Sequence, residues 1–449
     1  MKKKQQSSSF YQMIWRWHFY AGVIVAPFLF ILAFSGGIYL FKPQIEGFLY
    51  SEYTTIEEKE TDYLPYSAQA ESLHMSYPDA TISSVKISDQ TEATEFLVDN
   101  NGVGSSIFVN PYSGDITGIV NNEEKVTEIV KRLHSELWIA GTIGNRMVEL
   151  AACWGIILLI TGLYIWWPRS KKAIWGTFLP RLNKKGRVFW RDLHAVPAFW
   201  LSGSVFILIA TGLPWTGVLG PTIQSMATAP EYAYSFSDKP KSITLTEDIV
   251  DEVPWANQAL PVPSSHQHHY LPLSIDEAID LFEGKEIQKP YTVSMPQGEL
   301  VVYTASHMNQ PKDLATLHMD QYSGVLLTDV RYDDFSFGAK LVESGIALHE
   351  GRLFGWFNQF LGLLTCMGLM GIIGTSYVIW RKRAPKGSVG APKRSKDKKT
   401  TWIVFSIMFG FGVLMPLVGF SLIVLLLFDF IIRPIVQKKK HSNRTRYSA

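Results

Sequence analysis

The sequence predicts an α-helical membrane bundle with two extracytoplasmic α+β domains, formed by internal duplication. Three observations predict this fold class: apolar runs of about 20 residues, polar blocks between these runs, and stretches of the second half that match stretches of the first. The 449 residues are enough for several domains. Four of the apolar runs are expected to form core spans, and a last run forms either a hairpin or a fifth span.

The four expected core spans cover residues 19–41, 147–167, 196–215 and 356–380, with Trp and Tyr concentrated at their ends, as at membrane interfaces. Lys and Arg cluster at the N-terminus and in the segments that follow the second and fourth spans. The positive-inside rule places these clusters in the cytoplasm. We therefore expect a multi-pass membrane protein with a cytoplasmic N-terminus and extracytoplasmic polar blocks. The first span has no small-residue cleavage site and should be retained.

The last apolar stretch, 402–436, is longer than one span and has Pro416 in its middle. Basic clusters flank it on both sides, which favours a tight helical hairpin that returns to the cytoplasm. One long tilted helix is the alternative.

The expected organisation therefore has ten segments. In chain order they are a cytoplasmic N-terminus with the first span (1–42), a first extracytoplasmic domain (43–132), a membrane-edge helix with the second span (133–168), a basic cytoplasmic loop (169–191), the third span (192–215), a second extracytoplasmic domain (216–346), a membrane-edge helix with the fourth span (347–380), a basic cytoplasmic linker (381–401), the C-terminal hydrophobic stretch (402–436) and a basic tail (437–449).

The duplication is indicated by matching stretches at equivalent places in the two halves. WRWH at 15–18 corresponds to WRDLH at 190–194, and LHSELW at 133–138 corresponds to LHEGRL at 348–353. A Tyr-Ser-Gly turn occurs once in each polar block. Each half is therefore expected to consist of a span, an outer domain, a membrane-edge helix and a second span.

Each polar block is expected to fold as a small α+β domain. In PLSIDEAIDLF, Ser274 is an expected N-cap and Glu277 follows three residues later, which is a capping box before an amphipathic helix. The first block has an expected helix near 68–75. Strand-like runs follow each helix, at 82–88, 94–100, 105–111 and 115–120 in the first block and at 291–296, 299–306, 314–320 and 324–330 in the second.

Four of the histidines occupy matched membrane-edge positions. His18 and His194 lie at the expected cytoplasmic ends of the first and third spans, and His134 and His349 lie just before the second and fourth spans on the outer side. Paired neutral imidazoles from facing helices are the ligands of a six-coordinate b-type haem. The pattern predicts two non-covalent b-type haems, one on each pair. The alternative is that all four are interfacial or packed histidines.

Covalent c-type haem is disfavoured because the sequence has no CxxCH motif. Four arginines close to these histidines could approach haem propionates, namely Arg16, Arg132, Arg191 and Arg352. Glycine-rich stretches such as SGG at 35–37 would let helices approach a ring or one another. Gly141 and Gly144 are expected to break the helix between His134 and the second span, and Gly351 and Gly355 should do so in the second half.

Six other histidines give weaker signals. His266, His268 and His269 in an outer loop are compatible with a metal, but loop histidines are more often solvated. His74, His307 and His318 have no counterpart in the other half, which favours a structural role.

These motifs together resemble the PepSY-associated transmembrane family, also called iron-regulated membrane proteins, over about residues 10–436. The resemblance implies a protein of the bacterial inner membrane with two PepSY-like domains in the periplasm. Its ferric-siderophore reductase branch implies two b-type haems on membrane-edge histidines, which by motif match would be His18, His134, His194 and His349. The pairing itself is inferred from leaflet position.

The expected function is a di-haem transmembrane electron-transfer protein, an oxidoreductase of the ferric-chelate reductase type. A quinol or flavoprotein would donate the electron inside, and a ferric siderophore or another ferric chelate would accept it outside. No nucleic-acid partner is expected, and without a GxGxxG fingerprint the chain is not expected to bind NAD(P)H. One alternative is a membrane-anchored regulator that binds a protease or envelope protein. A transporter is disfavoured because no span shows a mid-membrane carboxylate.

Overall fold

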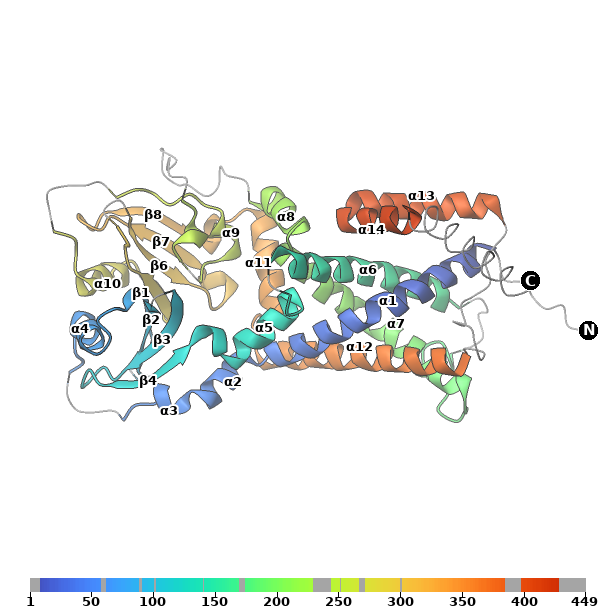
Figure 1. Ribbon diagram of the computed structural model, residues 1–449, viewed down its shortest axis with the longest axis horizontal. Helices are drawn as coiled ribbons and strands as arrows, with labels where there is room; N and C mark the ends of the chain where they lie inside the picture. Colours follow the sequence, from blue (N-terminus) through green and yellow to red (C-terminus); the bar gives the residue numbers. More distant parts are fainter. Residues whose placement is uncertain are drawn as a thin grey trace, which may run out of the picture. The chain divides into compact units, whose positions relative to one another are not determined.

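The computed structural model describes residues 9–57, 62–88, 91–100, 102–139, 141–168, 174–228, 244–250, 252–265, 271–298, 301–383 and 397–427 (Figure 1). These residues form two compact units. The helical unit takes its residues from Met1–Gly36, Leu133–Pro221 and Leu363–Ala449, and the sheet unit takes its residues from Gly37–Arg132 and Thr222–Gly362. Both halves of the chain contribute to each unit.

Among the described residues, four helices are long and apolar enough to cross a membrane. They are α1 (Ser9–Tyr39), α6 (Thr142–Trp166), α7 (Arg187–Gly212), which continues through the 3-10 turn Leu213–Trp215, and α12 (Trp356–Arg383). They match the four spans expected from the sequence and identify the chain, by helix length and apolar composition, as a membrane protein.

The C-terminal apolar stretch begins with a helical hairpin. Helix α13 (Lys398–Leu414) is capped by the side chain of Asp397, and α14 (Pro416–Leu427) starts directly after Met415. A Cβ atom built on Gly412 would lie 2.9 Å from the Cα of Gly419, so the two helices touch at their glycines. Between the two alternatives, the structure therefore has the hairpin rather than one long helix over 397–427.

The core of the helical unit joins this hairpin to two of the spans. Buried residues of α1, α6, α13 and α14 form one apolar cluster, which includes Val25, Trp154, Val404 and Val418. The indole nitrogen of Trp154 also donates a hydrogen bond to Ser421 Oγ on α14 at 3.2 Å.

A helix break near the membrane edge is present in both halves, as expected, but Gly144 is not part of it because this residue lies inside α6. Helix α5 (Val126–Glu136) ends before Leu137 and Trp138, which have positive φ angles, and α6 starts after Gly141 with φ 82°. In the second half, α11 (Phe337–His349) ends at His349, and Gly351 and Gly355 turn the chain with φ 81° and 59° before α12.

One eight-stranded antiparallel sheet forms the centre of the sheet unit, in the order β4-β3-β2-β1-β5-β6-β7-β8. The strands are β1 (Thr81–Ile87), β2 (Thr94–Asn100), β3 (Val103–Val109), β4 (Ile116–Asn121), β5 (Tyr291–Ser294), β6 (Tyr303–His307), β7 (Ala315–Met319) and β8 (Leu326–Arg331). The first polar block supplies β1–β4 and the second supplies β5–β8. The blocks meet where β1 pairs with β5, with Val85 opposite Val293.

Helices from both polar blocks pack into one core with this sheet. Leu73 of α4 (Tyr66–Ser76) and Phe282 of α10 (Ile275–Glu283) belong to the same buried cluster as the strand residues Val85 and Val293. The capping box at the start of α10 is confirmed: Ser274 Oγ accepts the Glu277 N–H at 3.2 Å, and the Glu277 carboxylate accepts the Ser274 N–H at 2.8 Å. The short helices are α2 (Lys42–Leu49), α3 (Ser51–Thr54), α8 (Leu219–Ala227) and α9 (Trp255–Gln258).

Candidate functional site

His18 of α1 is held by a threonine on α6. Its Nδ1 atom lies 2.9 Å from Thr161 Oγ1, and the Thr161 hydroxyl donates its own proton to the Ile157 carbonyl at 2.7 Å. The imidazole therefore donates from Nδ1, and Nε2 is the nitrogen with the lone pair. A Cβ atom on Gly162 would lie 3.2 Å from His18 Cε1, so the glycine makes room for the ring.

His194 of α7 is held in a similar way by α12. Its Nδ1 atom lies 3.0 Å from the Ile372 carbonyl, which can only accept, so Nδ1 again carries the proton. His194 and His18 also lie close enough to interact electrostatically. Both rings are half-buried in the helical unit, and their joint binding of one haem stays a prediction.

His134, in the last turn of α5, is held by α1. Its Nδ1 atom lies 3.0 Å from the Leu32 carbonyl and 3.1 Å from Ser35 Oγ. A Cβ atom on Gly36 would lie 2.9 Å from His134 Cε1, closer than real Cβ atoms approach a neighbour. The α1 backbone at the SGG stretch therefore lies against the imidazole of His134.

His349 is the last residue of α11 and is half-buried in the sheet unit. The chain turns directly after it, where the Ala347 carbonyl accepts the N–H groups of Arg352 and Leu353 at 2.9 and 3.0 Å. His134 belongs to the helical unit and His349 to the sheet unit, so the pairing of these two histidines stays a prediction.

Two of the four arginines considered for propionates already pair with carboxylates. Arg352 forms an ion pair with Glu350 at 2.6 Å, and Arg191 forms one with Asp192 at 2.8 Å. The guanidinium of Arg16 lies 5.0 Å from the ring centre of Tyr20. Arg132 is exposed.

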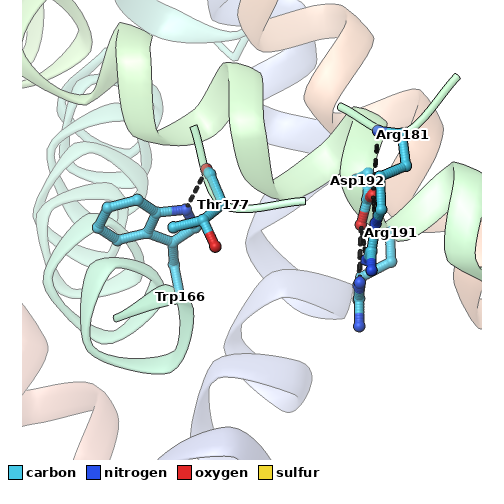
Figure 2. Close-up of polar contacts among 5 residues, drawn as sticks. All are labelled: Trp166, Thr177, Arg181, Arg191 and Asp192. Carbon is cyan, nitrogen blue, oxygen red and sulfur yellow. Dashed lines mark hydrogen bonds and ion pairs between the residues drawn. The ribbon is translucent and has the colours of Figure 1, made fainter. Parts of the chain in front are cut away.

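The basic loop between α6 and α7 is fixed at two points (Figure 2). Asp192, which is 1 % exposed, accepts hydrogen bonds from Arg181 at 2.7 Å and from Arg191 at 2.8 Å. At the end of α6, the indole of Trp166 donates to the Thr177 carbonyl at 2.9 Å. These contacts hold the loop next to the segment of α7 that carries His194.

The remaining histidines give no metal centre among the described residues, where no three His, Cys, Asp or Glu side chains converge. His307 and His318 are buried in strands, with Nδ1 bonded to the Pro290 carbonyl and to Thr304 Oγ1, respectively, at 2.8 Å. Burial lowers the pKa of His318 to about 3, so it is a neutral core residue. His74 is exposed on α4. His266, His268 and His269 lie outside the described residues.

Sequence reasoning missed the groups that orient the imidazoles. Thr161 is one hydroxyl in an apolar span, and its position opposite His18 could not be read from spacing alone. The carbonyls of Leu32 and Ile372 carry no sequence signal at all, because every residue has one. Glu149 of α6, a carboxylate within a span helix and 0 % exposed, was also passed over.

Comparison with known proteins agrees with the resemblance seen in the motifs. A family model described as the PepSY-associated TM region matches residues 15–383, a range that includes all four matched histidines and all eight strands. No curated protein matched the chain. This membrane protein, with its four span-length helices and its antiparallel sheet, therefore belongs to the PepSY-associated transmembrane family.

Proposed function

We propose that the protein is a di-haem electron carrier of the bacterial inner membrane that reduces ferric chelates, such as ferric siderophores, on the outer side. His18 and His194 would hold an inner b-type haem, and His134 and His349 would hold an outer one. Each haem would supply a one-electron redox centre. A quinol or flavoprotein inside the cell would supply the electron.

The observation that carries this proposal is the way the imidazoles are oriented. In a metal-binding histidine, the ring nitrogen that does not bind the metal usually donates to a carbonyl, hydroxyl or carboxylate, which fixes the tautomer. His18, His134 and His194 each engage Nδ1 in this way with a group on another helix. In His18 and His194, the same geometry leaves Nε2 as the nitrogen that would bind iron.

The glycines support the same proposal. Gly36 and Gly162 lie against the rings of His134 and His18; a side chain at Gly36 would clash with the imidazole, and one at Gly162 would crowd it. Contacts around a ligating imidazole orient its ring, and a glycine lets a neighbouring helix backbone come close enough to make such a contact.

The internal duplication belongs to the same proposal. The strand order is symmetric about the β1–β5 pair, and each half of the chain supplies two span helices and one membrane-edge helix. Two equivalent halves with inner and outer histidines would place one haem near each membrane surface. The basic segments would lie in the cytoplasm, and the PepSY-like sheet unit would lie in the periplasm.

Haem content tests the proposal directly. Protein purified in detergent after expression with adequate haem supply should show a reduced b-type spectrum and close to two haems per chain. His18→Ala and His194→Ala should each lose the same haem, and His134→Ala and His349→Ala should each lose the other. The exposed His74→Ala is the matched control and should keep both. A colourless wild-type protein under these conditions would refute the proposal.

Reduction of the chelate is tested separately. Reduced protein in liposomes is mixed in a stopped-flow instrument with an external ferric hydroxamate, and haem reoxidation is followed. The polar blocks are rich in Asp and Glu, so neutral or cationic chelates should react faster than strongly anionic ones. Reoxidation should slow sharply in a His134→Ala variant. If no ferric chelate reoxidises the haems, the regulator that binds an envelope protein or protease becomes the better explanation.

A further inference from the structure

Glu149 is a buried carboxylate that has no ion-pair partner among the described residues. It lies on the span helix α6, is 0 % exposed, and its Oε2 atom accepts the Val218 N–H at 2.8 Å. Its Oε1 atom is buried and has no hydrogen-bond partner among the described residues. No ion pair within the described ranges includes Glu149, and the neighbouring Arg146 is exposed. A buried carboxylate in this state is costly unless a positive species accompanies it.

Asn145 presents a second unsatisfied oxygen one helical turn earlier on the same face of α6. Its amide nitrogen donates to the Trp215 carbonyl at 3.2 Å, and its Oδ1 atom is buried with no hydrogen-bond partner in the part of the chain that the structure describes. A Cβ atom on Gly217 would lie 3.0 Å from this Oδ1. Asn145 and Glu149 therefore face the same short segment, 215–218.

This segment is a break between helices. The α7 span ends at Gly212, a 3-10 turn covers Leu213–Trp215, and α8 starts at Leu219. Non-helical backbone next to a membrane helix exposes carbonyl oxygens, and such breaks coordinate Na⁺ in membrane proteins. The segment could therefore add backbone oxygens to the two side-chain oxygens.

We propose that Asn145, Glu149 and the 215–218 segment bind a monovalent metal cation. A cation would satisfy both buried oxygen acceptors and balance the carboxylate charge, and hard oxygen ligands suit an alkali cation. The single carboxylate balances one positive charge, whereas a divalent ion would leave an uncompensated charge in the bundle. If Glu149 only capped the N-terminus of α8, the Val218 N–H would explain the position of its Oε2 atom. The Oε1 atom of Glu149 and the side-chain oxygen of Asn145 would still have no partner among the described residues.

Thermal unfolding of the full-length protein in detergent tests this site without depending on haem. Midpoints are compared in sodium, potassium and choline chloride at equal ionic strength and pH. The wild type should unfold several degrees higher in at least one alkali salt than in choline, because a cation that binds the folded state stabilises it. Glu149→Gln, which keeps the side-chain shape, should abolish this difference, and Asn145→Ala should reduce it. Glu128→Gln, on the surface of α5, should retain it.

Identical wild-type midpoints in the three salts would overturn the proposal and leave Glu149 as a cap of α8. A midpoint that follows pH but not the alkali cation would also overturn it, because a proton would then satisfy the two oxygens. An unchanged salt difference in Glu149→Gln would place the cation elsewhere. If that variant does not fold, the wild type and Asn145→Ala decide the question.

Discussion

Replacing Glu343 with glutamine should stabilise the sheet unit at alkaline pH. Glu343 lies on α11, is 1 % exposed, and accepts the Ala256 N–H at 2.9 Å. Burial raises the pKa of its carboxyl from the ordinary 4.5 to about 7, although the Ala256 N–H and Arg352 act in the opposite direction. The native protein therefore holds this proton more tightly than the unfolded chain does.

The sign and size of the effect follow from this difference. Between pH 4.5 and about 7 the folded state binds more protons at Glu343 than the unfolded state, so stability falls as pH rises through this window. The difference between the two pKa values of Glu343 corresponds to about 3 kcal/mol of unfolding free energy. This stabilisation is present below the pH range between the two pKa values and is lost above it. Glutamine keeps an oxygen for the Ala256 N–H and has no charge, so the variant should not show this loss.

The assay is thermal unfolding of wild type and Glu343→Gln in detergent at about pH 5 and about pH 8. We expect similar midpoints in acid and a higher midpoint for the variant in alkali. Glu128→Gln, whose side chain pairs with Lys131 at the surface, should unfold like the wild type at both pH values. A variant that is less stable than wild type at alkaline pH would refute the reasoning, since the N–H groups near Glu343 would then hold a carboxylate.

Two further predictions concern the helical unit. Gly36→Ala should displace the His134 ring and lower the content of one haem, whereas Gly22→Ala, where a Cβ atom would lie 3.9 Å from the nearest side chain, should not. Pyridine haemochrome assays of both variants decide this, and equal haem loss would mean that the contact at Gly36 is unimportant. Asp192→Asn should loosen the basic loop, because it weakens the contact with Arg181 at a buried site by about 1–3 kcal/mol. Trypsin should then cut this loop faster than in wild type, and an unchanged rate would show that the loop is fixed by other contacts.

Much of the secondary structure could be predicted from local patterns. The four spans, the strands of both polar blocks and the Ser274–Glu277 capping box depend on composition and short spacings, which a sequence displays directly. The sequence favours the hairpin without excluding one long helix, because Pro416 permits either a turn or a kink. The contact between Gly412 and Gly419, which brings the two helices together, is visible only in three dimensions.

The joining of the two polar blocks could not be predicted in the same way. The pairing of Val85 with Val293 unites strands from distant parts of the chain, and alternating apolar residues do not specify which edges meet. The candidate haem site could likewise be predicted only in part. The four histidines could be selected because they recur, whereas Thr161 and the Ile372 carbonyl act through contacts that no repeat reveals.

The β1–β5 pair also bears on how such a sheet could arise. Either four-stranded half alone would expose this strand as an edge, and an unpaired edge recruits strands from other molecules. The antiparallel pairing of β1 with β5 has the geometry that a twofold axis would impose on two copies of one strand. A half-length chain could cover this edge only by pairing with a second copy. That pairing would depend on the protein concentration. In the full chain both strands belong to one polypeptide, so β1 and β5 pair at any protein concentration.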